Sequence, residues 1–250
     1  MLRFLFFAVA IILFSKIEMV YATQPDLSFS QKHIYPVLKR GSDLHSGLTF
    51  LSGAMASVLA RSSDDQIRDQ WKDNQKMSKS DAHIGDLMGT GAATLLTAGA
   101  QYLFDQDESQ YQSQLRGFVY GGLSIYILKT GFGRNRPGLS NSHQSFPSGH
   151  TAIVFMTATQ LATTYGWPTG AVAFSLASFT AMSRLADDAH WFSDTVGGAF
   201  LGYFIGRATL YDSNDYLSDN NVSEKSAVTS IQIYPLFQSE TQGMTAIVSF

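Results

Sequence analysis

The sequence contains no cysteine, which excludes disulfide bonds and lipoprotein anchoring. It also lacks a long hydrophobic run. Two uncharged stretches of helical length, 87–104 and 167–183, span 18 and 17 residues and carry Thr, Ser and small residues at their centres. A membrane-spanning helix needs about 20 mainly apolar residues. We therefore expect both stretches to be buried helices of a soluble or peripherally attached protein.

Charged residues are scarce as well. The 250 residues include 17 basic and 20 acidic side chains, and the basic ones form no tract. A protein that binds nucleic acid usually presents a basic patch to the phosphate backbone. The mildly acidic balance therefore argues against nucleic acid as a partner.

The N-terminal residues have the pattern of an export signal. Arg3 precedes an unbroken apolar run over Phe4–Phe14, and small residues end at Ala22, which predicts a signal peptide over 1–22 and a mature chain from Thr23. An uncleaved anchor helix is the alternative, but the apolar run covers 11 residues and stops before Lys16. We expect a periplasmic protein, or one attached peripherally to the inner membrane.

The middle of the chain predicts an all-α fold. Apolar segments of helical length follow one another without a strand-like alternation, which indicates a compact bundle of about six helices over 47–210, after a polar lead-in over 23–46. The predicted helices are 47–60, 87–104, 116–129, 151–165, 169–184 and 190–210. The charged segment 61–81 predicts a surface helix or loop, and the Gly-, Pro- and Ser-containing segment 131–148 predicts a loop.

The tail over 211–250 has a different pattern. Two apolar-rich runs, Ile231–Phe237 and Met244–Phe250, flank the polar segment Gln238–Gly243, which predicts a β-hairpin. We expect this hairpin to pack on the helices or to contact another copy of the chain.

Three short blocks carry the residues suited to chemistry. They read KTGFGRNRP at 129–137, PSGH at 147–150 and SRLADDAHWFSD at 183–194. Together they supply several fixed cations and two histidines, with no evident cluster of metal ligands. Such a set of residues suits the binding of a phosphate-like dianion without a metal ion.

The third block contains a His-Asp pair. His190 and Asp194 are four residues apart, so on a helix they share a face, and the carboxylate can orient the imidazole and leave its other nitrogen free as a nucleophile. A continuous helix would separate Arg184 and His190 by about 120°. We therefore expect the helix to break within 185–189, and we expect Asp187 and Asp188 to be turn or capping residues.

The second block has the features of a helix start that binds an anion. Ser148 is a suitable N-cap, and Gly149 allows the backbone to approach an anion. The glycines at 197 and 198 predict close helix packing. The four other histidines have no partner at a useful spacing and are expected to be surface or structural residues: His33, His45, His83 and His143.

The spacing K-x6-R-P, P-S-G-H and S-R-x5-H-x3-D resembles the three-part signature of the type 2 phosphatidic acid phosphatase superfamily. This superfamily includes lipid phosphate phosphatases, class A bacterial acid phosphatases and vanadium haloperoxidases. The resemblance covers roughly 87–207, and all eleven specified positions match. Arg134 is not one of these positions, and we expect it to be an exposed supporting residue.

The resemblance implies a phosphatase that needs no metal or other cofactor and forms a phosphohistidine intermediate. It assigns His190 as the nucleophile, Asp194 as the residue that orients it, and His150 as the general acid. It assigns the remaining signature residues to the phosphate oxygens: Lys129, Arg136, Ser148, Gly149 and Arg184. Pro137 shapes the turn after Arg136.

Among exported relatives, the resemblance implies substrates such as phosphatidate, phosphatidylglycerol phosphate, undecaprenyl diphosphate or small soluble phosphate esters. We favour a lipid headgroup at a membrane surface. Two alternatives remain open: a vanadium-dependent haloperoxidase, and a non-catalytic envelope protein that retains the fold. The sequence does not indicate the oligomeric state.

Overall fold

The computed structural model describes residues 33–74, 76–105, 108–138, 142–211, 230–238 and 241–249. They belong to two units, one ending at Tyr211 and one beginning at Asp212, which are described separately below. The signal peptide expected over 1–22 lies outside the described residues and stays a prediction.

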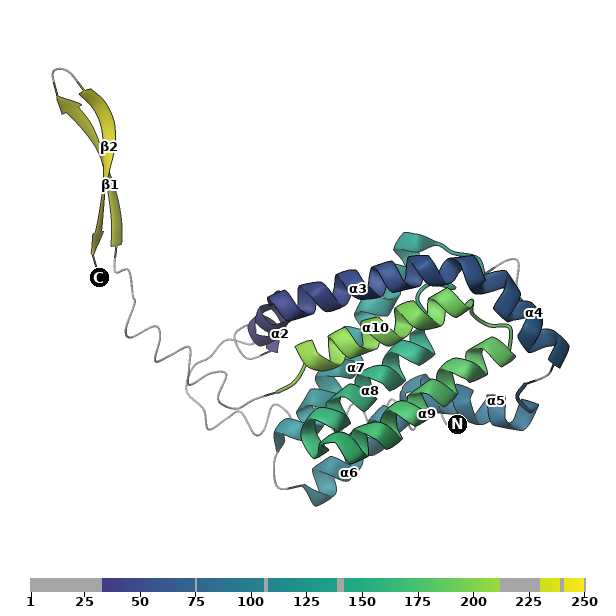
Figure 1. The fold of residues 1–250 in the computed structure, drawn as a ribbon. Helices are drawn as coiled ribbons and strands as arrows, with labels where there is room; N and C mark the ends of the chain where they lie inside the picture. Colours follow the sequence, from purple (N-terminus) through teal and green to yellow (C-terminus); the bar gives the residue numbers. More distant parts are fainter. Residues whose placement is uncertain are drawn as a thin grey trace. The chain divides into compact units, whose positions relative to one another are not determined.

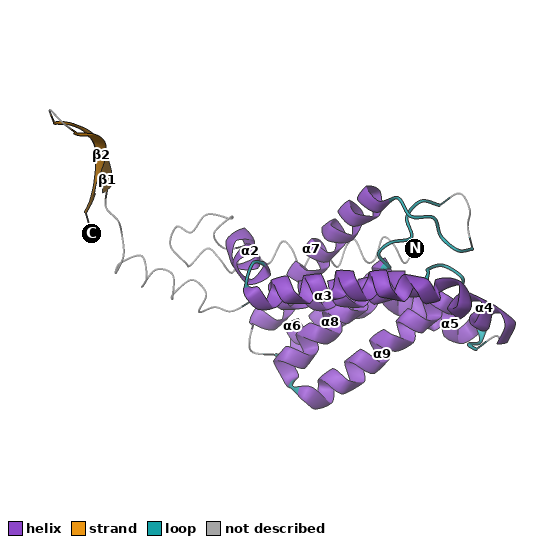
Figure 2. Ribbon diagram, turned by 45° about the horizontal axis from the view of Figure 1, so that its top comes forward, coloured by secondary structure: helices purple, strands orange, loops and turns teal. Residues whose placement is uncertain are grey.

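The first unit is a helical bundle, as the sequence predicts (Figure 1). Its α-helices are α2 Tyr35–Gly41, α3 Leu44–Ala60, α4 Asp64–Asn74, α5 Lys79–Leu87, α6 Ala93–Phe104, α7 Glu108–Phe132, α8 Gly149–Tyr165, α9 Trp167–Ala186 and α10 Phe192–Ala208. The charged segment 61–81 thus forms α4 and the start of α5, and the expected loop 131–148 follows the end of α7. The described parts of that loop are drawn in teal beyond α7 in Figure 2.

Helix α8 lies at the centre of the bundle and packs most closely against α10. The glycines at 198, 202 and 206 of α10 are four residues apart and share a face. A Cβ atom would lie 2.6 Å from the Ser148 carbonyl oxygen at Gly198, and 2.3 Å from the Ala152 carbonyl oxygen at Gly202. The two helices therefore pack backbone to backbone, which holds their N-terminal ends side by side.

The apolar core joins three helices. Its buried members come from α7, α8 and α10: Ile125, Ala152, Ile153, Met156, Leu201 and Ile205. Burial of such side chains supplies the main favourable term in folding. The core thus holds together the three helices that carry sequence blocks at one of their ends.

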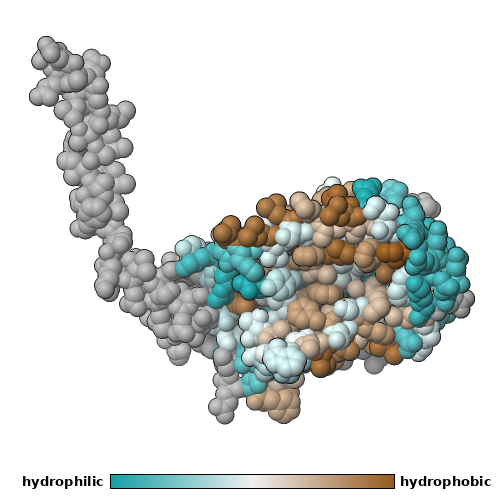
Figure 3. Space-filling model, in the orientation of Figure 1, coloured by the Kyte–Doolittle hydropathy of each residue, from teal (hydrophilic) through white to brown (hydrophobic). Residues whose placement is uncertain are grey.

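Helix α3 covers α10 and presents an apolar outer face. Its exposed hydrophobic residues are Leu44, Leu48, Phe50, Leu51, Met55, Val58 and Leu59. Figure 3 shows hydrophobic residues gathered along α3, and hydrophilic residues at the end where α4 and α5 lie. Within the described ranges, no helix combines the length and the apolar character that crossing a membrane requires.

The second unit contains the predicted hairpin. Strand β1, Ser230–Gln238, pairs antiparallel with β2, Thr241–Ser249, in a register that matches Ser230 with Ser249 and Gln238 with Thr241. The second strand begins three residues earlier than the sequence pattern predicts, because Thr241–Gly243 pair with β1 instead of forming part of the turn. The expected contact of the hairpin with the helices stays a prediction.

Candidate active site

The three sequence blocks meet at one end of the bundle. Lys129 lies in the last turn of α7, the second block begins α8, and the third block joins α9 to α10. A backbone hydrogen bond from Ser148 N to the Asp194 carbonyl oxygen, 3.0 Å long, ties the second block to the third. A second one, from Ser145 N to the Arg134 carbonyl oxygen at 2.8 Å, holds the loop between α7 and α8.

His190 lies in the connection between α9 and α10, and only 3% of its surface is exposed. The predicted helix start at His190 is wrong, because α10 begins at Phe192 and Trp191 is its N-cap residue. The Asp194 carboxylate accepts a hydrogen bond from Trp191 N at 3.0 Å, so the capping turn brings His190 and Asp194 together. His190 Nδ1 lies 3.7 Å from Asp194 Oδ2, which is an ion-pair distance and longer than a hydrogen bond.

The predicted break before His190 is present. Helix α9 continues through Ala186, and Asp187 and Asp188 form a turn in which Asp188 has a φ of 51°. Both aspartates are paired with guanidinium groups. Asp187 Oδ2 lies 3.1 Å from Arg184 Nη1, and Asp188 accepts two hydrogen bonds from Arg68, at 2.6 and 2.7 Å.

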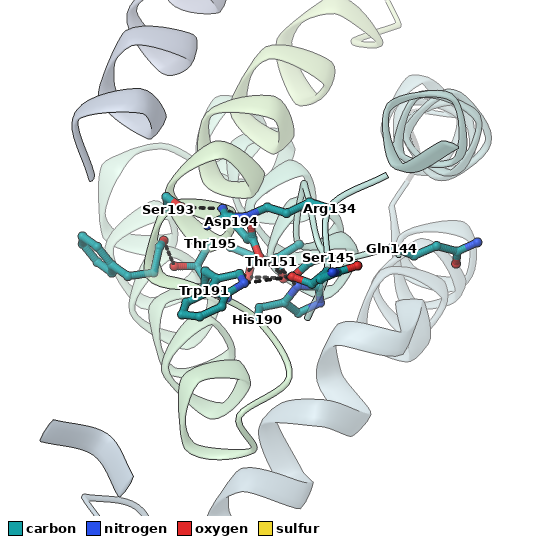
Figure 4. Close-up of polar contacts among 12 residues, drawn as sticks. Arg134, Gln144, Ser145, Thr151, His190, Trp191, Ser193, Asp194 and Thr195 are labelled. Carbon is teal, nitrogen blue, oxygen red and sulfur yellow. Dashed lines mark hydrogen bonds and ion pairs between the residues drawn. The ribbon is translucent and has the colours of Figure 1, made fainter. Parts of the chain in front are cut away.

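Asp194 is completely buried and holds several hydrogen bonds (Figure 4). It accepts from Ser145 Oγ at 2.5 Å and from Arg134 Nη1 at 2.6 Å. Burial acts to raise the pKa of Asp194, but the nearby His190 imidazole, the hydrogen bond from Ser145 and the charge of Arg134 outweigh it, so the pKa is lowered. Asp194 is therefore ionised at neutral pH and faces the imidazole as a carboxylate.

Arg134 is a half-buried structural link, and the expectation that it is exposed is wrong. Its side chain is 20% exposed and joins Asp194 to Asp64, with Arg134 Nη2 at 2.7 Å from Asp64 Oδ2. Asp64 also accepts from Ser193 N at 2.8 Å and from Ser193 Oγ at 2.7 Å. The first turn of α4 thus braces the residue that faces His190.

Asp64→Ala is expected to lower the free energy of unfolding by about 2–4 kcal/mol, because it leaves Ser193 N and one side of Arg134 buried without their acceptor. The neighbouring Asp65 is exposed, so Asp65→Ala is the matched control and should change the free energy by less than about 0.5 kcal/mol. Urea unfolding of both variants measures the difference. Equal stabilities would contradict the bracing role of Asp64.

Three cations, Lys129, Arg136 and Arg184, lie near the two histidines. Burial and the charge of Arg136 together lower the pKa of Lys129 to about 8. Burial, followed by the charge of Arg184, also lowers the pKa of Arg136. These mutual effects indicate that the three cations lie close together and repel one another, an arrangement that favours binding of an anion.

Two guanidinium groups in this cluster have unused donors. Arg136 Nε and Arg184 Nε are both buried and have no hydrogen-bond partner among the described residues. Lys129 Nζ donates to the carbonyl oxygen of Gln144 at 2.6 Å, which holds its side chain against the loop. Since buried N–H groups are nearly always paired, these donors indicate a site for acceptor oxygens.

His150 lies in the first turn of α8 beside Asp86 of α5. Asp86 Oδ1 lies 3.1 Å from His150 Nε2 and accepts a hydrogen bond from Arg184 Nη1 at 2.5 Å. Burial and the charge of Arg184 lower the pKa of His150 to about 4, while Asp86 opposes this shift. The backbone at Gly89 makes room for the histidine, because a Cβ atom there would lie 2.5 Å from His150 Cβ.

Burial also lowers the pKa of His190 to about 4, although Asp194 opposes this shift and the charges of Lys129 and Arg136 add to it. The imidazole is therefore neutral at neutral pH. A neutral imidazole with one nitrogen toward a carboxylate has a lone pair on its other nitrogen. This is the form that a nucleophile requires.

Ser148 occupies the N-cap position of α8, as predicted, but its side chain makes no capping hydrogen bond. Its hydroxyl instead accepts from Thr151 Oγ1 at 3.0 Å. Gly149 allows α8 to begin beside α7, because a Cβ atom there would lie 3.7 Å from Lys129 Cε and 3.3 Å from Ile125 Cγ2. The helix N-terminus therefore lies beside the cations.

The structure brings all eight predicted site residues to this end of the bundle and adds four that the sequence analysis did not assign to the site: Asp64, Arg68, Asp86 and Ser145. Asp86 lies 98 residues from Arg184 in the chain, and Asp64 lies 129 residues from Ser193. No short spacing could have found such pairs. The described ranges contain no group of three or more His, Cys, Asp or Glu residues arranged to hold a metal ion.

Comparison with known proteins extends these observations. Residues 107–217 match the model of the PAP2 superfamily. A 105-residue stretch is 43% identical to the lipid A 1-phosphatase of Porphyromonas gingivalis. That alignment covers 41% of this chain and 23% of the length of the relative.

Two crystal structures superpose on parts of this chain. The phosphatase described as the first transmembrane PAP2 type phosphatidylglycerolphosphate phosphatase from Bacillus subtilis superposes with a TM-score of 0.51 at 16% identity, over 78% of this chain and 99% of its own. LpxE from Aquifex aeolicus superposes with a TM-score of 0.46 at 23% identity, over 55% of this chain and 89% of its own. The first of these similarities shows a shared fold.

Proposed function

We propose that this chain, whose residues 107–217 match the model of the PAP2 superfamily, is a member of that superfamily and a metal-independent phosphatase that hydrolyses phosphate monoesters or diphosphates. One observation carries the proposal. The buried Nε–H groups of Arg136 and Arg184 have no hydrogen-bond partner among the described residues. They belong to a cluster of cations beside His190, which is neutral at neutral pH. The three cations can supply the positive charge that phosphoryl transfer requires.

In the first step, His190 Nε2 attacks phosphorus, an N–P bond forms, and the ester P–O bond breaks. Asp194 stabilises the positive charge that develops on the imidazole, because its carboxylate lies 3.7 Å from Nδ1. His150, as imidazolium, gives its proton to the leaving alkoxide. The cations Lys129, Arg136 and Arg184 stabilise the charge on the equatorial oxygens, together with the start of α8.

In the second step, water attacks phosphorus, His150 takes a proton from the water, and the N–P bond breaks to release inorganic phosphate. His190 returns to its neutral form. His150 thus carries the proton in both steps. Since its pKa is about 4 before substrate binds, the negative charge of the phosphate must raise this pKa in the complex.

A lipid phosphate is the substrate class that we favour, such as phosphatidate, phosphatidylglycerol phosphate or undecaprenyl diphosphate. The similar stretch of the P. gingivalis protein, named a lipid A 1-phosphatase, supports this choice. The exposed apolar face of α3 supports it too, because such a face suits contact with a lipid surface. We propose that the mature protein acts in the periplasm, at the surface of the inner membrane.

Orthovanadate is expected to inhibit hydrolysis, because it adopts the trigonal-bipyramidal geometry of the transferring phosphoryl group and offers oxygens to the cation cluster. EDTA is expected to leave the rate unchanged. Steady-state hydrolysis of an aryl phosphate with each reagent checks both outcomes. Loss of activity in EDTA that a divalent ion restores would contradict the metal-independent mechanism, and bromide oxidation with vanadate and peroxide would favour a haloperoxidase.

A further inference from the structure

A polar cavity lies beside the candidate active site. Its volume is about 560 Å³, and it is lined by residues of α4, α5 and the turn after α9: Lys72, Lys79, His83, Asp86, Ala186, Asp187 and Asp188. In Figure 3 the end of the unit where α4 and α5 lie is hydrophilic. The mechanism above uses none of the residues that line it.

One wall of the cavity leads from solvent to the active site. Lys79, His83 and Asp86 occupy positions i, i+4 and i+7 of α5, so they share one face of that helix. Asp86 forms the inner end, since its carboxylate contacts both His150 and Arg184. Seven residues of α-helix rise about 10 Å, so Lys79 lies about this far from the inner end.

The acidic side chains of the cavity have charged partners, whereas two of its basic side chains have none among the described residues. Each carboxylate has a guanidinium partner, because Asp86 and Asp187 contact Arg184 and Asp188 contacts Arg68. Over the part of the chain that the structure describes, Lys79 and His83 have no ion-pair or hydrogen-bond partner. The cavity therefore offers unpaired donors at its outer end.

Lys72 adds a second ammonium group from α4. Its side chain is 55% exposed, and Lys72 Nζ lies 3.9 Å from Asp188 Oδ2, a carboxylate already held by Arg68 at 2.6 Å. This long contact in solvent leaves Lys72 available to another anion. Two ammonium groups thus face the cavity from different helices.

We propose that this cavity binds the alcohol part of the substrate and selects phosphate esters that carry a second anionic group about 10 Å from the scissile phosphate. The inference rests on the proposed phosphatase function. The scissile phosphate binds at Arg184 and His150, and the second anion binds at Lys72 and Lys79. The preference should appear in KM, because these lysines do not touch the reacting atoms.

The test compares two alkyl phosphates of equal length that span this distance, one ending in a phosphonate and one ending in a hydroxyl group. The phosphonate cannot be hydrolysed, so each substrate has one scissile bond. We expect the unmodified protein to favour the phosphonate in kcat/KM by about three- to tenfold through KM, and increasing salt should reduce the preference.

The Lys72→Met, Lys79→Met double variant should lose this preference and keep its kcat and KM for the hydroxyl-ended substrate. Lys76→Met is the matched control, because Lys76 lies between the two in the sequence but does not line the cavity. Lack of preference in the unmodified protein, or a preference that survives the double variant, would overturn the subsite while leaving the phosphatase intact. Hydrolysis of neither substrate would contradict the phosphatase function, and the subsite with it.

Discussion

His190→Ala is expected to lower turnover by at least about 1,000-fold, because no neighbouring group can form the N–P bond in its place. Asp194 is held by Arg134 and Ser145 and is an acceptor rather than a nucleophile in this site. Steady-state hydrolysis of an aryl phosphate measures the loss. His45→Ala, on the exposed surface of α3, is the matched control and should keep full activity.

The fold of the His190 variant must be checked, since the side chain is buried and its removal leaves a cavity. Thermal unfolding of His190→Ala and of His190→Gln, which keeps most of the volume, separates lost chemistry from lost structure. Both variants should be folded and inactive. Activity above about a tenth of the unmodified rate in either folded variant would refute the assignment of His190 as the nucleophile.

His150→Ala is expected to have a large effect that depends on the leaving group. With an alkyl phosphate, the alkoxide needs a proton as it departs, and loss of the general acid should lower kcat/KM, which reports formation of the phosphoenzyme, by about 10²–10⁴-fold. With a nitrophenyl phosphate, the leaving group is stable as an anion, so the loss should be markedly smaller. The ratio of the two losses is the measurement.

Equal losses on both substrates would argue against the general-acid role, because a residue that only binds phosphate contributes alike to both. His143→Ala serves as the control, since His143 is exposed in the loop that follows α7. It should leave both rates unchanged. A smaller loss with the alkyl phosphate than with the nitrophenyl phosphate would likewise contradict the assignment.

Much of the site could be predicted because its chemistry is concentrated in three short blocks. The spacing of His190 and Asp194 identified a pair that the structure holds 3.7 Å apart, although a capping turn and not a helix face joins them. A continuous helix would point Arg184 and His190 in different directions, so a break within 185–189 could be predicted. The chain does turn there, at Asp187 and Asp188. The helical bundle followed from apolar segments without strand-like alternation.

The bracing residues could not be predicted, because their partners come together only through packing of distant helices. Asp64 reaches Ser193 and Arg134 only because α4 turns back toward the start of α10. Asp86 reaches His150 because α5 packs against α9 and the segment Met88–Ala92 that follows it packs against α8. Gly89 in that segment has no side chain and leaves room for His150. A single sequence gives no signal for such contacts, since acidic residues in a charged segment are more often solvated.

The phosphoenzyme tests the central claim most directly. In His150→Ala, an aryl phosphate should still phosphorylate His190, while hydrolysis of the N–P bond lacks its general base, so the intermediate should accumulate. Alkaline quenching within seconds, digestion and mass spectrometry should detect one phosphoryl group on the peptide that contains His190, and none in the variant that also carries His190→Ala. A phosphoryl group on another residue, or turnover without any phosphoenzyme, would contradict the account.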